Sequence, residues 1–303
     1  MDKITIDVCP LCGGNHFKSL MTCTDFYATK ETFELYTCTD CGFTFTQDVP
    51  KGSSIDKYYE TPSYISHSDT RTGAINIVYH YVRSFMLKKK VQLVINTSHL
   101  KVGRLLDIGT GTGYFPHAMQ SCGWKVEAIE KNLKAQDFAH EHFNIQVKGD
   151  EALYKYKKES FDAITLWHVM EHLESINDVW ELLYSLLKKN GVLIIAVPNH
   201  SSYDAKKFGE YWAAYDVPRH LWHFTPETMQ KMAIKHHFYL SKQYSMPFDA
   251  FYISMLSEKY KGCKFNFFTG AYCGLLAWLH SLNNKEKSSS IIYVFRKKYI
   301  NEE

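Results

Sequence analysis

The chain has 303 residues, of which 45% are hydrophobic, and its formal net charge is +3. This length can hold one large domain and a small one around a sizeable core, and so small a charge argues against a polyanionic partner such as nucleic acid. No apolar run reaches eighteen residues, and residues 1–7 lack a signal-peptide pattern. We therefore expect a cytoplasmic protein without a membrane partner.

The first fifty residues contain two cysteine pairs, each with the spacing C-x-x-C. Two such knuckles bring four thiolates to one point, which makes a closed tetrahedral and therefore structural zinc site. Residues 33–37 and 43–46 alternate in the manner of short strands. These patterns predict a zinc ribbon over residues 1–50 that holds structural Zn²⁺. Its expected ligands are Cys9, Cys12, Cys38 and Cys41.

Residues 51–100 are expected to form a linker and a helical lead-in. A small polar break at residues 51–54 sets the domain boundary. A segment rich in tyrosine follows over residues 58–67. From about residue 72 to residue 95, apolar side chains recur with a period near 3.6, which predicts a helix packed on the core.

A strand over residues 105–108 runs into a turn with three alternating glycines and then into a helix. Glycine lacks Cβ, so such a turn lets a ligand lie against the backbone at the positive end of the helix. A dinucleotide fingerprint would need its third glycine at Tyr114, one residue later than it occurs. The turn therefore indicates a nucleotide-type site of another kind. Its glycines are Gly109, Gly111 and Gly113.

The next strand, over residues 125–130, ends in an acid. Glu130 stands where a carboxylate would bind ribose hydroxyls. Strand, glycine turn, helix, strand and acid together resemble the class I S-adenosylmethionine-dependent methyltransferases of the methyltransferase-23 group over residues 100–245. The resemblance implies an α/β, Rossmann-like, doubly wound sheet of seven strands, the last antiparallel, in a domain over residues 101–303.

The resemblance also implies that S-adenosylmethionine is the cofactor. Its expected contacts lie in the glycine turn, at the ends of the second and third strands and at the end of the fourth. An acid at Asp150 would accept the adenine amino group, or it would cap the following helix. The residues are Asp107, Gly109, Thr110, Gly111, Gly113, Tyr114, Phe115, Glu130, Lys131, Asp150, Glu151, Ala152, Trp167 and His168.

Further strands are predicted over residues 145–150, 161–168 and 192–199, with a helix over residues 176–189 that ends on Asn190-Gly191. The segment from His168 to His172 matches H-x-x-E-H, an inverted zinc-protease signature that requires one continuous helix. The unbroken apolar strand before it opposes that interpretation.

On the acceptor side, the resemblance directs Glu171 and His172 toward the second reactant. Residues 216–227 resemble the acceptor-side loop of small-molecule methyltransferases, and a histidine there would be a general base or a local hydrogen-bonding group. The segment before the first core strand often folds over the cofactor as a lid in such enzymes. The remaining acceptor-side candidates are His220, His223, Tyr59, Tyr64 and His67.

Strands six and seven are predicted over residues 238–244 and 290–295. Between them lies an insert, residues 250–288, with two amphipathic helices that are too short and too polar to cross a bilayer. An insert of this length is usually functional. We expect a cap beside the acceptor pocket or the surface of a homodimer.

Together these patterns predict an S-adenosylmethionine-dependent methyltransferase of a small-molecule acceptor, with a sugar or nucleotide sugar as the hypothesis for that acceptor. Methyl transfer itself requires no catalytic metal. One alternative is a methyltransferase that binds RNA through the zinc ribbon, but residues 1–50 have no arginine and more acids than lysines. The other alternative, a non-catalytic scaffold with a vestigial cofactor site, stays open.

Overall fold

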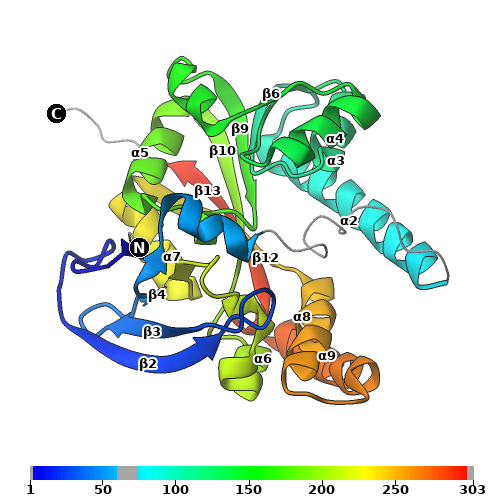
Figure 1. Ribbon diagram of the computed structural model, residues 1–303. Coiled ribbons are helices and arrows are strands. Elements are labelled where there is room, and N and C mark those ends of the chain that lie inside the picture. Colours follow the sequence, from blue (N-terminus) through cyan, green and yellow to red (C-terminus); the bar gives the residue numbers. More distant parts are fainter. Residues whose placement is uncertain (1–2, 60–73, 299–303) are drawn as a thin grey trace.

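The computed structural model describes residues 3–59 and 74–298, and a seven-stranded sheet forms its centre (Figure 1). The strand order is β12–β13–β10–β9–β6–β7–β8, with β13 antiparallel to both of its neighbours. This order confirms the predicted doubly wound α/β fold with an antiparallel last strand. The strands are β6 (Arg104–Ile108), β7 (Lys125–Ile129), β8 (Val147–Lys148), β9 (Phe161–Trp167), β10 (Leu187–Pro198), β12 (Phe238–Ser245) and β13 (Ser290–Lys297).

Helices cover both faces of this sheet because neighbouring strand residues point to opposite sides. Leu105 packs with helices α2 and α3, whereas Leu106 packs with α5 and α7. The carboxyl ends of the parallel strands β6, β7 and β9 share one edge. The helices are α2 (Ala74–Ser98), α3 (Tyr114–Ser121), α4 (Leu133–Phe143), α5 (Ile176–Leu186), α6 (Tyr203–Phe208) and α7 (Pro226–Lys235), and the 3₁₀ turns are η1 (Gly52–Tyr58), η2 (Asp150–Lys155), η3 (Met170–His172), η4 (Gly209–Tyr211), η5 (Ala213–Tyr215) and η6 (Lys285–Lys287).

Two predicted boundaries are wrong. Helix α5 ends at Leu186, three residues before the predicted end, and the next residue, Leu187, already pairs with Phe161 of β9. The chain leaves the helix directly in extended conformation, so the predicted Asn190-Gly191 cap does not form. The third strand is only Val147–Lys148, because the chain turns into η2 at Asp150.

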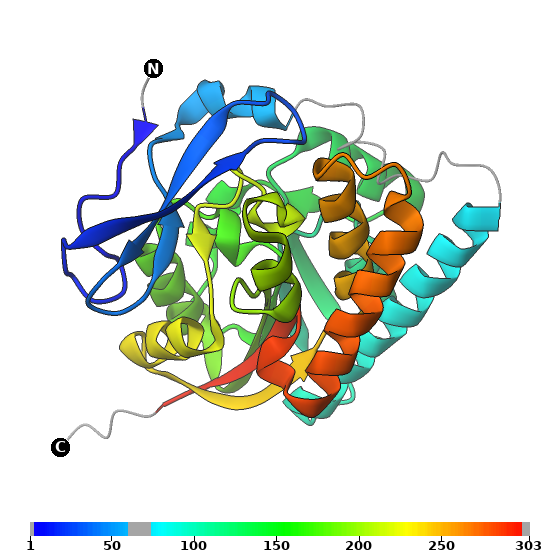
Figure 2. The same cartoon turned by 90° about the horizontal axis from the view of Figure 1, so that it is seen from below.

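The N-terminal module forms a second sheet in the order β11–β4–β3–β2 (Figure 2). Strand β11 belongs to the core domain by sequence, yet its Trp222 pairs with Phe45 and its His223 with Thr44 of β4. The sheet of the ribbon is therefore completed by a strand from the acceptor-side loop. The strands of this module are β1 (Lys3–Ile4), β2 (Phe17–Thr24), β3 (Thr32–Cys38), β4 (Thr44–Thr46), β5 (Val49–Pro50) and β11 (Trp222–His223).

The insert forms two packed helices, α8 (Pro247–Tyr260) and α9 (Asn266–Asn283), on one side of the sheet (Figure 1). Gly270 and Gly274 allow the close approach, because a Cβ on either would lie less than 3 Å from the backbone of α8. Among residues 3–59 and 74–298, no helix has both the length and the apolar composition to cross a membrane.

Candidate functional site

The glycine turn after β6 has the geometry of a ligand cradle. Gly109, Gly111 and Gly113 have φ of 68°, 56° and 83°, in the left-handed region that favours glycine. A Cβ on Gly109 would lie 2.3 Å from Val169, so this glycine also lets the turn pack on the segment after β9. At Gly111 no atom lies within 4 Å of the corresponding position, which leaves that backbone open to a ligand.

Glu130 lies at the end of β7, beside the turn. Its Oε2 accepts a hydrogen bond from the Gly111 backbone N–H at 2.9 Å, and its Oε1 accepts one from Asn132 at 2.9 Å. Each carboxylate oxygen keeps a second lone pair. The glutamate is thus fixed in orientation and able to accept further hydrogen bonds from a ligand with hydroxyl groups.

Asp107 stabilises the glycine turn through hydrogen bonds to its carboxylate. Its carboxylate accepts hydrogen bonds from Thr110 at 2.7 Å and from Thr165 at 2.6 Å. Burial raises the pKa of this carboxyl to about 6, although the two hydroxyls and the nearby Lys90 favour its charged form. Asp107 therefore shapes the turn and does not face an open surface.

Asp150, Glu151 and Ala152 open η2 next to Glu130, whose backbone N–H donates to the Lys148 carbonyl. Burial raises the pKa of Asp150. The structure therefore places this acid at the same sheet edge as Glu130, and Lys131 is close enough to act on its charge.

Two of the predicted cofactor residues, Tyr114 and Phe115, pack against other aromatic rings beside the glycine turn. Tyr114 packs edge-on against Phe143, and the Arg83 guanidinium lies 4.0 Å from its ring centroid. Phe115 is buried against Trp167, with ring centroids 5.5 Å apart. These rings pack helix α3 onto the sheet beside the turn.

A cavity of about 400 Å³ opens at the carboxyl ends of β9 and β10. Segments from the whole chain contribute to it, including the ribbon, η3, the acceptor-side loop and helix α8. Acids, histidines and tyrosines dominate its polar lining. The polar and aromatic residues are Tyr27, His168, Glu171, Asp216, Arg219, His220, Asp249, Tyr252, Tyr260 and Ser290.

His168 lies between two carboxylates at the rim of this cavity. Its Nε2 is 3.2 Å from Asp249 Oδ2 and its Nδ1 is 3.5 Å from Glu171 Oε1. Burial opposes charge on the ring, but the two carboxylates outweigh burial and raise the pKa of His168 to about 10. The pair with Asp249 connects the end of β9 to the insert.

His172 and His220 lie side by side, with ring centroids 4.5 Å apart. Nδ1 of His172 is 3.0 Å from the Arg219 carbonyl, and Nδ1 of His220 is 2.9 Å from the Ala214 carbonyl. Burial, followed by the nearby His220, lowers the pKa of His172 to about 4, so its ring is neutral. The Tyr59 hydroxyl also reaches His172, at 3.4 Å.

Arg219 joins the acceptor-side loop to the ribbon. The side chain is buried and pairs with Asp216 at 2.6 Å and with Asp25 at 3.0 Å. It also donates to the Tyr58 carbonyl at 2.7 Å and covers the ring of Tyr27. One guanidinium therefore joins three segments at one wall of the cavity: the acceptor-side loop, a turn of the ribbon and the end of η1.

With this geometry described, comparison with known proteins identifies the family. A methyltransferase-domain family matches residues 79–242, which is more than half of the chain. The chain belongs to this methyltransferase family. The match covers α2, the glycine turn, Glu130 and the sheet through most of β12, and it confirms the resemblance seen in the sequence.

Curated relatives of this methyltransferase chain match over part of their length. The ubiquinone biosynthesis O-methyltransferase of Pelagibacter ubique is 34% identical over 107 residues, which cover 33% of this chain and 44% of that protein. The protein of the same name from Paraburkholderia phymatum is 26% identical over 139 residues, 43% of this chain and 60% of its own length. The chain thus spans about half the length of the curated relatives it matches.

Solved methyltransferase structures share the fold. Magnesium protoporphyrin IX methyltransferase from Synechocystis PCC 6803, with bound S-adenosylhomocysteine, aligns with a TM-score of 0.53 at 11% identity over 82% of this chain and 100% of that one. Phosphoethanolamine N-methyltransferase 2 from Haemonchus contortus, in complex with S-adenosylmethionine, aligns with a TM-score of 0.51 at 17% identity over 91% and 72%. At these identities the likeness shows the fold alone.

The structure separates the predicted acceptor-side residues of the methyltransferase into two groups. Glu171, His172 and His220 come together at the cavity. His223 lies in the ribbon sheet, where its Nε2 is 2.9 Å from the Thr46 hydroxyl, and it does not line the cavity. The candidates Tyr64 and His67 lie outside the described residues.

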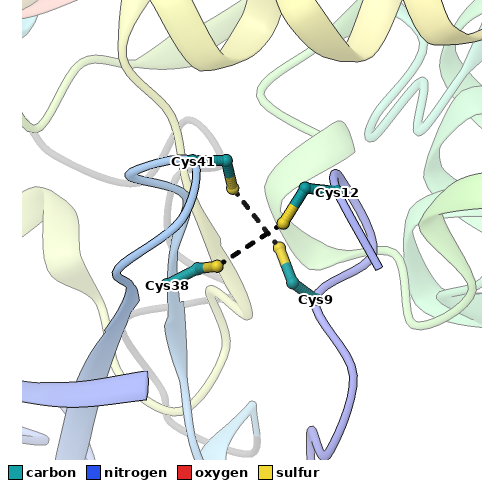
Figure 3. A group of neighbouring side chains, drawn as sticks. All are labelled: Cys9, Cys12, Cys38 and Cys41. Carbon is teal, nitrogen blue, oxygen red and sulfur yellow. Dashed lines mark hydrogen bonds between the residues drawn. The ribbon is translucent and has the colours of Figure 1, made fainter. Parts of the chain in front are cut away.

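The four cysteines of the ribbon converge as their spacing predicts (Figure 3). Sγ of Cys9 is 3.5 Å from that of Cys41, and Sγ of Cys12 is 3.6 Å from that of Cys38. A tetrahedral zinc with Zn–S bonds of about 2.3 Å would set its sulfur atoms about 3.8 Å apart. The donor set and its spacing fit a closed zinc site, about which the ribbon would fold.

Several residues of the site were not predicted from the sequence. Asp249 reaches the cavity from the insert and Tyr27 from the ribbon, while Asp25 of the ribbon pairs with Arg219 behind the cavity wall. Lys90 of α2 acts on both Asp107 and Asp249, and its ammonium lies 4.4 Å from the Trp167 ring centroid. Lone acids and lysines in helices and hairpins carry no motif, so the sequence offered no signal for them.

Proposed function

We propose that the protein transfers a methyl group from S-adenosylmethionine to a hydroxyl oxygen of a small-molecule acceptor. The observation that carries this proposal is that one short segment, residues 168–171, contacts the glycine turn and lines the cavity. Val169 packs on Gly109, while His168 and Glu171, next to Val169 in sequence, line the cavity. The two binding regions therefore share one crevice at the carboxyl edge of the sheet, as ligands do in such folds.

The residues of the turn fit the cofactor. Glu130 would accept hydrogen bonds from the ribose hydroxyls, and the open backbone at Gly111 would face the methionine part. Asp150 stands where it would accept from the adenine amino group. When bound, S-adenosylmethionine supplies an electrophilic methyl group, and the protein's task is to align the acceptor with it.

The acceptor would occupy the cavity of about 400 Å³. Its tyrosines suit a small organic molecule with apolar faces, and its acids and histidines suit hydroxyl groups. The acceptor hydroxyl must also lose its proton, and Glu171, His172 and His220 are the groups gathered at that wall. The relatives named as O-methyltransferases support an oxygen acceptor.

Glu130→Ala tests the cofactor half. Loss of the charged partner of the ribose should weaken S-adenosylmethionine binding by about 1–3 kcal/mol, which is roughly fivefold to 150-fold in affinity. Isothermal titration calorimetry measures this, with Glu141→Ala on the exposed side of α4 as the matched control. Parent protein that binds no S-adenosylmethionine would mark a vestigial cofactor site and overturn the proposal.

A second experiment tests the acceptor. The protein is incubated with S-adenosylmethionine labelled in the methyl group and with panels of phenols, catechols, sugars and nucleotide sugars. Label in an ether-linked methyl group of a small product supports the proposal. Label found only in RNA or protein would contradict the small-molecule acceptor.

A further inference from the structure

Glu171 is a buried carboxylate that lacks hydrogen bonds. The residue is fully buried, and neither of its oxygens has a hydrogen-bond partner among the residues that the structure describes. The ring of His168, held positive by its two carboxylates, forms an ion pair with Glu171 at 3.5 Å, yet no hydrogen bond satisfies either carboxylate oxygen. A buried carboxylate without hydrogen bonds is costly, so a further cation that binds its oxygens directly would be favourable.

Two histidines lie beside Glu171, and their Nδ1 atoms both face carbonyl oxygens. Carbonyl oxygens only accept hydrogen bonds, so the Nδ1 atoms of His172 and His220 must carry the protons that go to Arg219 and Ala214. In a neutral imidazole of this tautomer the lone pair lies on Nε2, and Nε2 of His220 lies 3.9 Å from Asp216 Oδ2. Imidazoles that bind metals are oriented in this way, by donating their other N–H to a carbonyl.

The three side chains are close enough to share one ion. One ligand atom from each of Glu171, His172 and His220 lies within 4.8 Å of the others. Four carboxylates stand at or directly behind the cavity wall, those of Asp25, Asp216, Asp249 and Glu171. They outnumber the three nearby cations Arg219, His168 and Lys90, even when His168 is counted as charged. The local field therefore favours an added cation.

We propose that Glu171, His172 and His220 bind one divalent first-row transition-metal ion. Two imidazoles and one carboxylate suit such ions better than Mg²⁺ or Ca²⁺, which prefer oxygen ligands alone. The sequence motif H-x-x-E-H contributes only its last two residues, because both ring nitrogens of His168 face carboxylates and His220 from the acceptor-side loop completes the set. This set differs from that of the ribbon, which is four thiolates.

The ion would have open coordination positions toward the cavity, since Glu171 and His220 both line it. Its role there rests on the proposed function. As ligands of the ion, Glu171, His172 and His220 would no longer accept the proton themselves. Coordination would instead lower the pKa of the acceptor hydroxyl, which releases its proton to water. The oxygen then forms the bond to the methyl carbon, and the electron pair of the breaking S–C bond stays on sulfur. Methyl transfer does not require a metal, so the donor set alone carries the inference.

Manganese binding to the full-length, zinc-loaded protein tests the site, because Mn²⁺ does not compete for a four-thiolate site. Electron paramagnetic resonance measures free Mn²⁺ during a titration. We expect one bound Mn²⁺ per chain, with affinity lowered about tenfold or more in Glu171→Gln and in His220→Gln. Tyr252→Phe, on the same cavity but without a ligand atom, should bind Mn²⁺ as the parent does.

Parent protein without bound Mn²⁺, or unchanged binding in both variants, would overturn the site. Calorimetry with S-adenosylmethionine checks that the isosteric Glu171→Gln protein is folded, and Co²⁺ serves as a second probe whose spectrum should lack thiolate charge-transfer bands. Mn²⁺ binding without S-adenosylmethionine binding would refute the proposed function alone. S-adenosylmethionine binding without Mn²⁺ binding would refute this inference alone.

Discussion

The two halves of the crevice are built in opposite ways. The cofactor half comes from one continuous stretch, from Asp107 to Asp150, in which strand, turn and strand follow each other directly. The acceptor half is assembled from the ribbon, η3, the acceptor-side loop and α8, which are far apart in sequence. Local backbone geometry therefore determines the first half, whereas tertiary packing determines the second. Changes in each half should have separable effects.

The largest expected effect on the acceptor half of the crevice comes from removal of the zinc ion. Structural zinc contributes on the order of 10 kcal/mol to the folding of small modules, and β4 of the ribbon pairs with β11 of the acceptor-side loop. We expect Cys38→Ser to lose zinc and methyl transfer while S-adenosylmethionine affinity stays within a few fold. Metal analysis and calorimetry measure these, with Cys122→Ser, outside the cluster, as control. Zinc that persists in Cys38→Ser would show that other ligands hold it.

Arg219→Met should destabilise the protein by about 3–5 kcal/mol, because it leaves the carboxylates of Asp25 and Asp216 without their buried partner. Urea denaturation followed by circular dichroism measures the free energy of unfolding. Lys231→Met is the matched control, since its pair with Glu227 is exposed and should contribute at most about 1 kcal/mol. Equal losses in the two variants would mean that the ribbon is not held through Arg219.

Gly109→Ala should damage the cofactor half instead. Both Gly109 and Gly111 have positive φ, which costs other residues about 1–2 kcal/mol. Only at Gly109 does the added Cβ also collide with Val169. We expect losses of about 2–4 kcal/mol for Gly109→Ala and about 1 kcal/mol for Gly111→Ala, by urea denaturation. The reverse order would contradict the packing described for this turn.

His236 lies outside both halves of the crevice. Its protonation should account for a small part of the stability that the folded protein loses at acidic pH. Its ring stacks on Trp180, and burial, with Lys235 and His237 nearby, lowers its pKa from 6.5 to about 4. Between these values the unfolded chain binds a proton that the folded chain does not, so stability falls as pH falls through this window.

His236→Phe keeps the ring but cannot bind a proton. Its free energy of unfolding should change less between pH 7 and pH 4.5 than that of the parent, by about 1–2 kcal/mol. Denaturation at several pH values measures the slope, and His140→Gln on exposed α4 is the control. If the free energy of unfolding depends on pH in the same way for the parent and for His236→Phe, the lowered pKa of His236 does not contribute to the acid sensitivity.

The sequence predicts a cofactor half from local signals. Gly109, Gly111 and Gly113 need positive φ, and Glu130 follows at the spacing of one helix and one strand. The convergence of the four cysteines was predictable as well, because each C-x-x-C pair brings two thiolates to one point. The doubly wound sheet with its antiparallel last strand was implied by the family resemblance and is confirmed.

The acceptor half depends on contacts that no spacing encodes. Arg219 meets Asp25 across 194 residues, and Asp249 meets His168 only because α8 folds back over the end of β9. The boundary error at Leu187 has a similar cause, since pairing with Phe161 overrides the helical preference of that segment. Contacts between residues far apart in the chain determine these features, and such contacts cannot be predicted from the spacing of residues in a single sequence.

The pairing of β11 with β4 has a consequence for any shortened version of the chain. Phe43 stacks on Trp222 and contacts Phe224, and Thr46 donates to the His220 carbonyl. A protein that begins after residue 50 would present these two aromatic rings and a bare strand edge to solvent, where another chain can pair with them. Such a truncation should aggregate. A domain exchange that gives this enzyme a different N-terminal module would therefore have to redesign residues 219–224 at the same time.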